Sequence, residues 1–417
     1  MNHNSSKITE TETGVCLGGF RAKGLRGKKY GLMIISNSTA CETAAVFTKN
    51  YIKAAPVIVD MERISQGAKL KVIVANSGCA NACTAQEGID DAKSMCAQAA
   101  DALGISELEV GVSSTGLIGS KLDMNVISSM IDECSKELEE FSDNLNNTEN
   151  LKDNLNNIKS IELRRRASLD AARAIMTTDT KEKMISVNYR GIEIGAIAKG
   201  AGMIAPDMAT MLCFITTNAK LSKGDLQGCL TDSVEDSFNM LVIDGEMSTN
   251  DTVMLLSECT CECSLPDFKF ALDYVTKDMA KKIAQDGEGA TKFIEVEVRG
   301  AERKQIARAA AKAIASSSLV KTAIYGENPN WGRIAGKLGS VIELDFEKTD
   351  IFFEGDRGRV CMVEEGMAKK DIRSEAEDLL RGDHIKIIVN LNSGDFEATA
   401  YGCDMTEEYI RVNAEYN

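Results

Sequence analysis

Histidine is nearly absent from this chain, and its scarcity limits the catalytic chemistry that the sequence allows. Only two histidines occur among 417 residues: His3 in a polar N-terminal stretch and His384 at the start of an apolar run. A zinc site built from three histidines is therefore impossible. A serine or cysteine triad with an imidazole base would have to use one of these two. If the chain is an enzyme, we expect its base to be another group.

The sequence also lacks a basic stripe and an apolar leader. Its 48 Lys and Arg residues against 63 Asp and Glu give a net charge of −15. Nucleic-acid binders need clustered cations to neutralise phosphates, so we expect no nucleic-acid partner. Residues 200–219 carry Asp207 as their only charge, but they also include Pro206 and three methionines. We expect a buried core segment there, no membrane span, and a cytoplasmic protein.

The cysteine and glycine patterns do not match a metal site or a nucleotide loop. Thirteen cysteines are scattered along the chain, and we expect them to be reduced. Cys259, Cys261 and Cys263 form a cluster whose alternate spacing predicts one face of a strand rather than a zinc site. The stretch 287–292 has one residue between its glycines, whereas a Walker loop needs four. We therefore expect neither a metal nor a nucleotide bound in these modes.

Length and periodicity predict a layered α/β (α+β) sandwich of mixed sheets covered by helices, in two or three packed units. Strands are predicted at residues 30–35, 44–47, 71–75, 109–112, 187–189, 192–198, 211–215, 253–256, 293–298, 350–353, 359–363, 384–392 and 396–400. Helices are predicted at residues 88–103, 123–141, 160–176, 226–238 and 302–316. The Asn-rich stretch 143–157 has few apolar anchors, and we expect a surface insertion there.

Residues 199–217 have a pattern that suits a self-activating nucleophile. Lys199 precedes Gly-Ala-Gly and Pro206, and Thr210 opens an apolar run typical of a buried strand. A cut before Thr210 would release an α-amine with an unperturbed pKa of about 7.7–8.0. Such an amine can act as base towards its own hydroxyl, so no histidine is needed. Spacing alone leaves an ordinary strand end as the alternative, because β-branched residues open many strands.

Several longer motifs follow one another along the chain. They are VFTKN from residue 46, NSGCANACT from 76, STG from 114, TTDT from 177, KGAGMIAPDMATMLCFITT from 199, DGEMSTNDT from 244, DGEGATK from 286, NPNWGRI from 328 and NAEY from 413. In identity and order these motifs resemble the ornithine acetyltransferase / glutamate N-acetyltransferase family of arginine biosynthesis. The resemblance covers nearly the whole chain, which makes coincidence negligible.

The resemblance implies a self-processing acyltransferase. The chain would cut itself between Ala209 and Thr210 into an α chain of residues 1–209 and a β chain of residues 210–417. Both chains would stay together in a fold of the N-terminal-nucleophile type, similar to that of related self-processing amidohydrolases. Thr210 would attack the acetyl carbonyl of N2-acetylornithine, release ornithine and pass the acetyl group to glutamate by a ping-pong route.

The resemblance also assigns the other site residues by motif. The Thr115 hydroxyl and the Gly116 backbone N–H would form the oxyanion hole, where negative charge develops. Lys199 would offer an ammonium to the substrate α-carboxylate, and Glu288 would accept hydrogen bonds from an amine. The expected substrate-binding residues are Thr177, Lys199, Thr210, Glu288 and Asn413. The alternatives are a surface lysine at 199, a helix cap at 177 and an ordinary chain end at 413.

Related activities remain open at this point. A bifunctional enzyme would also acetylate glutamate from acetyl-CoA, using the same nucleophile and pocket. A self-cleaving amidase or aminopeptidase would release ornithine without an acyl acceptor, and a non-catalytic binding protein would keep only the fold. The transfer needs no cofactor, because the acetyl donor carries its own leaving group; acetyl-CoA would enter as a co-substrate. The implied assembly is a heterotetramer of two α and two β chains.

The chain departs from the family pattern at a few positions. Cys79 stands where the family usually has Asn, and Asp207 and Asn328 exchange acid and amide relative to common members. Family members often have a Ser or Thr five residues after Asn413, whereas the sequence stops at Asn417. We expect the Asn417 side chain or terminal carboxylate to substitute, or the substrate pocket to be more open.

Overall fold

The computed structural model describes residues 7–149, 154–205 and 211–415, which form two compact units. Within these residues, the first unit contains 7–200, 211–234 and 248–279, and the second contains 201–205, 235–247 and 280–415. Two units agree with the two or three that the length predicts. Each unit has its own sheet.

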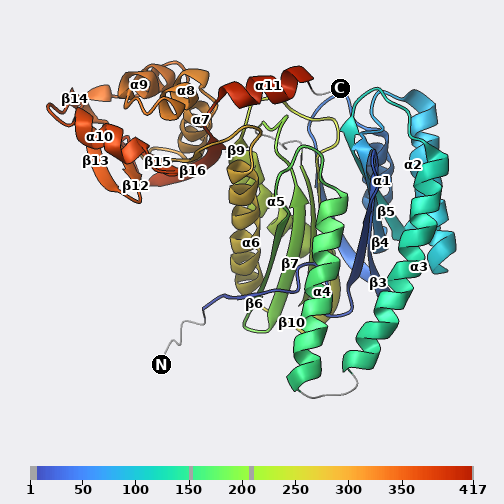
Figure 1. The fold of residues 1–417 in the computed structure, drawn as a ribbon. Coiled ribbons are helices and arrows are strands. Elements are labelled where there is room, and N and C mark those ends of the chain that lie inside the picture. Colours follow the sequence, from blue (N-terminus) through green and yellow to red (C-terminus); the bar gives the residue numbers. More distant parts are fainter. Residues whose placement is uncertain (1–6, 150–153, 206–210, 416–417) are drawn as a thin grey trace, which may run out of the picture. The chain divides into compact units, whose positions relative to one another are not determined.

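One mixed sheet forms the frame of the first unit. In the described part of the chain its strands follow the spatial order β1 (Thr9–Thr11), β6 (Lys183–Tyr189), β7 (Ile192–Lys199), β8 (Leu212–Lys220), β10 (Thr252–Glu262), β3 (Gly31–Phe47), β4 (Leu70–Cys79) and β5 (Val110–Leu117), with β2 (Arg21–Arg26) beside β3 (Figure 1). β8 and β10 are parallel, as are β4 and β5, and the remaining pairs are antiparallel. The strands predicted at 187–189 and 192–198 are confirmed as β6 and β7, which pair as an antiparallel hairpin.

The long strand β3 joins the two parts of this sheet. Its first part pairs with β2 and β4, and its last part pairs with β10, with a bulge between Ser36 and Cys41. The sequence predicted two separate strands at 30–35 and 44–47, so the single strand of 17 residues is a correction. The polar residues between the two apolar runs stay extended because the strand changes partners across the bulge.

Helices cover both faces of this sheet. Those before residue 286 are α1 (Ala55–Ser65), α2 (Ala85–Leu103), α3 (Met124–Glu149), α4 (Asn154–Ala174), α5 (Lys223–Glu235) and α6 (Leu265–Gln285). Leu32 and Ile34 of β3 belong to a core with α2 and α3, whereas Met33 and Ile35 belong to a second core with α4. The second core also contains Phe214 of β8, so the two parts of the sheet pack against each other. Successive residues of β3 alternate between the two cores because successive side chains along a strand point to opposite faces of the sheet.

The second unit has a sheet with helices packed against it. As far as the structure describes them, its strands follow the order β14 (Met367–Ala368), β13 (Gly358–Glu364), β12 (Asp350–Gly355), β15 (His384–Asn390), β11 (Phe293–Ala301), β16 (Phe396–Cys403) and β9 (Leu241–Val242). The helices are α7 (Lys304–Ala315), α8 (Ser318–Tyr325), α9 (Trp331–Gly339), α10 (Arg373–Leu380) and α11 (Glu407–Glu415). Apolar residues of α7 to α10 share one core with the central strands. Mixed sheets covered by helices are thus confirmed in both units.

His384 is the first residue of β15, as predicted. Its Nε2 lies 2.8 Å from Oε2 of Glu295 on the neighbouring strand β11, and Lys281 lies 2.8 Å from the other oxygen of Glu295. Burial raises the pKa of Glu295, but Lys281 and His384 lower it by more than burial raises it. The pKa of Glu295 therefore lies below its ordinary value. His384 and Lys281 therefore both contact the carboxylate of Glu295.

The Asn-rich stretch 143–157 is largely helical where the structure describes it. α3 extends to Glu149 and α4 begins at Asn154, with residues 150–153 outside the described range. Leu145 is fully buried, although most described neighbours in this stretch are exposed. The stretch therefore extends two packed helices, which corrects the expectation of a separate insertion, while its mostly exposed position agrees with a surface location.

The three clustered cysteines do not share one strand face. β10 has a register shift between Ser257 and Cys261, and Cys259 in this bulge adopts φ +57°. Cys263 lies beyond the end of the strand. The simple alternation that placed all three on one face is therefore wrong, because β10 advances four residues from Ser257 to Cys261 while its partner β8 advances only two, from Thr217 to Ala219.

Candidate active site

The predicted oxyanion residues lie at the end of β5. Ser77 and Gly78 of β4 pair with Thr115 and Gly116 of β5, and Thr115 is buried. Gly116 has φ +128°, and a Cβ added to it would lie 2.5 Å from the carbonyl carbon of Gly78. A side chain at 116 would collide with backbone, so the close approach of the two strands requires glycine. Among the described residues, the Thr115 hydroxyl has no hydrogen-bond partner.

Two buried asparagines fix the backbone around this strand end. Asn76 donates to the carbonyl of Cys79 at 3.0 Å and accepts from the Ser114 hydroxyl at 2.6 Å. Asn250 donates to the carbonyls of Ala80 and Ser114 at 2.6 and 2.8 Å. Both side chains therefore donate to backbone carbonyls at this strand end. Both asparagines lie in motifs of the sequence, but no role was predicted for either of them.

The loop after α4 lies against the same strand end. Ser77 donates from its hydroxyl to the carbonyl of Ala174 at 2.7 Å. Arg26 donates to the Ser77 hydroxyl at 2.8 Å and to the Met176 carbonyl at 2.5 Å. Thr177 is the next residue after Met176. Arg26 therefore links the backbone next to Thr177 to Ser77, the β4 residue that pairs with Thr115. Thr177 lies beyond the end of α4, and no cap bond from it to that helix is present in the described residues.

Lys199 is the last residue of β7 and is only 2% exposed, so the surface-lysine alternative is wrong. Asp179 is the carboxylate near it: its Oδ1 accepts from the Gly200 N–H at 2.6 Å and from Lys183 Nζ at 2.7 Å. Its Oδ2 accepts from the Thr177 N–H at 3.1 Å. One carboxylate therefore connects the loop of Thr177 to the end of β7.

The charge state of Asp179 follows from its neighbours. Burial raises the pKa of its carboxyl, but Lys199, Lys183 and the Gly200 N–H lower it to about 2. Asp179 is thus a buried anion that balances buried ammonium groups. The sequence carries only a weak signal for this role, an acid in TTDT followed four residues later by Lys183, which is a pattern that is common on surfaces.

Two predicted substrate residues meet in the second unit. Asn413 of α11 donates from Nδ2 to Glu288 Oε2 at 2.8 Å, so it is more than an ordinary chain end. The Glu288 N–H donates to the carbonyl of Ala201 at 2.9 Å. A Cβ added to Gly202 would lie 2.3 Å from the Glu288 carboxyl carbon. The segment that begins at Ala201 is therefore packed directly on Glu288.

Asp244 binds the backbone of the same segment at residues 203 and 204. Its carboxylate accepts from the N–H groups of Met203 and Ile204 at 2.7 and 2.8 Å. The Ile204 carbonyl accepts in return from the Ile243 N–H at 3.0 Å. Burial raises the pKa of the nearby Tyr409 hydroxyl, and the charge of Asp244 raises it further. Neither Asp244 nor Tyr409 was assigned a role from the sequence.

Some predicted positions fall outside the described residues, and Cys79 lies at the end of β4. Asp207, Ala209, Thr210 and Asn417 lie outside the described ranges, so the cut site stays a prediction. Cys79 is buried and donates from its thiol to the Ser120 carbonyl at 3.2 Å. Burial raises its pKa, which keeps the thiol neutral.

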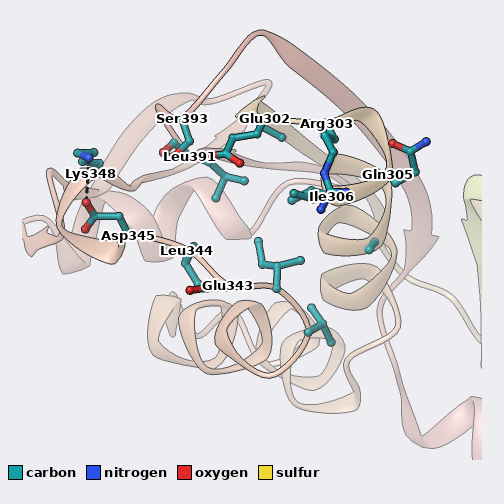
Figure 2. A pocket seen from close by; sticks show the side chains of 14 residues that line it. Glu302, Arg303, Gln305, Ile306, Glu343, Leu344, Asp345, Lys348, Leu391 and Ser393 are labelled. Atoms are coloured by element: carbon teal, nitrogen blue, oxygen red, sulfur yellow. Dashed lines mark hydrogen bonds and ion pairs between the residues drawn. The ribbon is translucent and has the colours of Figure 1, made fainter.

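The second unit contains a pocket of about 800 Å³. Figure 2 shows the side chains that line it. It is lined by residues of the α7 start, of the loop 341–345 and of the loop after β15, among them Arg303, Ile306 and Leu344. None of the predicted site residues lines it. Across the described residues, no group of three or more His, Cys, Asp or Glu side chains is placed to hold a metal ion. Likewise, none of the described helices has both the length and the apolar character of a membrane span.

Comparison with known proteins identifies the family to which the chain belongs. The ArgJ family profile matches residues 18–417. The glutamate N-acetyltransferase of Methanocaldococcus jannaschii is 42% identical over 414 residues, which cover 95% of this chain and 96% of the relative. The arginine biosynthesis bifunctional protein ArgJ of Caldanaerobacter subterraneus subsp. tengcongensis is 41% identical over 408 residues, with 94% of each covered. The chain belongs to the ArgJ family, as the motifs predicted.

Among solved structures, the arginine biosynthesis bifunctional protein argJ from Bacillus halodurans is similar to part of the chain. It has 40% sequence identity and a TM-score of 0.46, and the match covers 49% of this chain and 98% of the solved chain.

We predict that Gly116→Ala destabilises the protein by about 2 kcal/mol or more. The new methyl group would collide with backbone, and the alanine would have to adopt an unfavourable φ. Gly119→Ala is the matched control, because Gly119 also has positive φ but has no atom within 4 Å of an added Cβ. It should cost only about 1 kcal/mol. Thermal unfolding of both variants measures the difference, and equal losses would contradict the close approach of β4 and β5.

We predict that Asp179 contributes about 2 kcal/mol to stability near neutral pH. Its pKa is lower in the folded chain than its ordinary value of 3.8, so this contribution is present above about pH 4. It is lost as the pH falls from about 4 towards 2. Urea unfolding at several pH values should show a smaller acid-dependent loss in Asp179→Asn than in the unmodified protein. An identical slope in both proteins would argue against an ionised Asp179.

Proposed function

We propose that this chain is a self-processing glutamate N-acetyltransferase that moves an acetyl group from N2-acetylornithine to glutamate in arginine biosynthesis. The observation that carries the proposal is the match to a glutamate N-acetyltransferase at 42% identity over 95% of the chain. The cleavage segment KGAGMIAPDMATMLCFITT and the STG motif, both quoted from this sequence, supply the reacting groups.

In the proposed reaction the Thr210 hydroxyl oxygen attacks the acetyl carbonyl carbon, and the free α-amine of Thr210 takes the hydroxyl proton. The Thr115 hydroxyl and the Gly116 N–H stabilise the oxyanion. The bond to ornithine then breaks, and the amine returns the proton to the departing nitrogen. Glutamate attacks the acetyl ester in turn, and its lost proton restores the Thr210 hydroxyl. Two features support the oxyanion assignment. The Thr115 hydroxyl has no hydrogen-bond partner in the described part of the chain, and the backbone at position 116 leaves room only for glycine.

The proposed substrate contacts are assigned residue by residue. Lys199 would bind an α-carboxylate, supported by its burial at the end of β7. Thr177 would add a neutral hydrogen bond from the loop that Asp179 holds. Glu288 and Asn413 would bind amino and polar groups, supported by their mutual hydrogen bond. No cofactor is required, because the acetyl donor carries its own leaving group.

The proposed products of the cut are the chains 1–209 and 210–417, and we propose that two of each assemble into a heterotetramer in the cytoplasm. Their association within one protomer is supported by the sheet of the first unit. β7 precedes the proposed cut and β8 follows it, and the two pair antiparallel from Ile194 to Lys199. Backbone hydrogen bonds would therefore hold the chains together after the peptide bond is broken.

A second activity, acetylation of glutamate from acetyl-CoA, is favoured by the similarity to a bifunctional ArgJ protein at 41% identity. Both activities would use Thr210 as the acyl carrier. They differ only in the donor that delivers the acetyl group.

We predict that Thr210→Ala yields one uncut chain of 45.1 kDa with no acetyl transfer, because the variant lacks the nucleophile for both steps. The unmodified protein should give two chains, one of them beginning TMLCF. Denaturing intact-mass spectrometry and N-terminal sequencing measure the cut. Thr231→Ala, at an exposed position on α5, is the control and should cut normally. Two chains in Thr210→Ala would refute the assigned site.

We predict that ornithine release from N2-acetylornithine rises strongly when glutamate is added, as a ping-pong transfer requires. Release that does not depend on the acceptor would instead identify an amidase. Acetyl-CoA and glutamate, supplied without N2-acetylornithine, test the second activity. Formation of N-acetylglutamate in that assay establishes the bifunctional enzyme, and its absence leaves the transferase alone.

A further inference from the structure

Asp251 is a buried acid that the proposed transfer does not use. It lies directly before β10 and is completely buried. Its Oδ1 accepts from the N–H of Met211 at 3.1 Å. Its Oδ2 has no hydrogen-bond partner in the described residues, which is rare for a buried carboxyl oxygen.

The backbone around Asp251 holds this carboxyl in place. The Asp251 carbonyl accepts from the Thr48 N–H at 2.9 Å, and the Thr48 hydroxyl donates to the Ser248 carbonyl at 2.8 Å. The Thr252 N–H donates to the Met211 carbonyl at 3.1 Å. Asp251 is therefore tied to the start of β8 by its side chain and by the next residue.

Its sequence neighbour, Asn250, extends the connection to the predicted oxyanion residues. Asn250 donates to the carbonyl of Ser114, which directly precedes Thr115. The pair Asn250–Asp251 thus joins the end of β5 to the residue that follows Thr210. The nitrogen and hydroxyl of Thr210 are only a few covalent bonds from the Met211 nitrogen that Asp251 contacts.

The environment favours the neutral form of this acid. Burial raises the pKa of Asp251 well above its ordinary value, and the Met211 N–H and the Lys199 ammonium offset only part of that rise. A protonated carboxyl can deliver a proton and accept another. An acceptor for the Met211 N–H alone would not need an acid here, since an amide could serve.

Self-cleavage has a requirement that the later transfer does not share. The α-amine that acts as base in the transfer exists only after the cut, so the uncut chain needs another group to move protons. His384, the histidine within the described residues, is already hydrogen-bonded to Glu295 of the neighbouring strand β11, so we do not assign this role to it. Lys199 is assigned to substrate and lies beside the anion Asp179.

We propose that Asp251 moves the protons of the self-cleavage step, an inference that rests on Thr210 being the nucleophile. The Thr210 oxygen forms a bond to the Ala209 carbonyl carbon, and the bond from that carbon to the Thr210 nitrogen breaks. The carboxyl of Asp251 gives its proton to the departing nitrogen and takes up the proton of the Thr210 hydroxyl. Water then hydrolyses the resulting ester, which leaves a carboxyl group on Ala209 and restores the hydroxyl of Thr210.

The test compares Asp251→Asn with the unmodified precursor. Asparagine keeps the volume and the acceptor for the Met211 N–H but cannot exchange the proton. We expect the cut, followed by intact mass after synthesis, to slow by about 100-fold or more. Turnover per cut chain in acetyl transfer should stay within about threefold of the unmodified value. Cutting at the unmodified rate in a folded variant overturns the proposal, and so does an equal loss of cutting and of turnover per cut chain.

A second pair covers the case in which Asp251→Asn does not fold. Asp251→Glu and Asp251→Gln introduce side chains of equal length, of which only glutamate carries an exchangeable acidic proton. The glutamate variant should cut faster, and equal rates overturn the proposal. Thr210→Ala distinguishes a wrong nucleophile from a wrong role of Asp251. If Thr210→Ala is still cut, the proposed nucleophile is wrong. If Thr210→Ala stays uncut and Asp251→Asn is cut at the unmodified rate, only the role of Asp251 is refuted.

Discussion

Backbone pairing of β8 with β7 on one side and β10 on the other is the constraint on which the first unit depends. Leu212 pairs with Lys199 of β7 and with Thr252 of β10. A strand in the middle of a sheet is held by two ladders, and here the side chains of Leu212, Cys213 and Phe214 are buried as well. A break in the chain just before β8 removes none of these bonds, so the sheet can tolerate a cut at the place where the motifs put it.

Two buried acids near this strand have opposite charge preferences. Asp179 accepts hydrogen bonds from Thr177, Gly200 and Lys183, and its pKa falls to about 2. Asp251 accepts one hydrogen bond, and burial raises its pKa well above the ordinary range. The electrostatic influence of Lys199 reaches both. Acids whose surroundings push their pKa values apart are suited to different tasks, one fixing geometry and the other moving protons.

The sequence was most informative about apolar runs and motif positions. Most predicted strands and helices appear within a few residues, and the family assignment is confirmed. It was silent on the partners of Asp179 and Asn250, because Gly200 and Ser114 lie 21 and 136 residues away along the chain. It also missed the bulge at Cys259, since a strand's register depends on its neighbour rather than on its own alternation. Short helices such as α8 and α9 lack enough turns to show a clear period.

The pairing of β3 with β10 matches Phe47 to Thr252, residues that are distant in sequence and lie on opposite sides of position 210. In an uncut chain, the covalent connection keeps these strands at a high effective concentration, so their meeting is an intramolecular event. After a cut at 209–210, global unfolding would release two separate molecules, and reassembly would become bimolecular. Equilibrium stability would then depend on protein concentration. The uncut precursor would therefore fold in one intramolecular process. The two cut chains would refold together less readily after global unfolding, because they must first meet in solution.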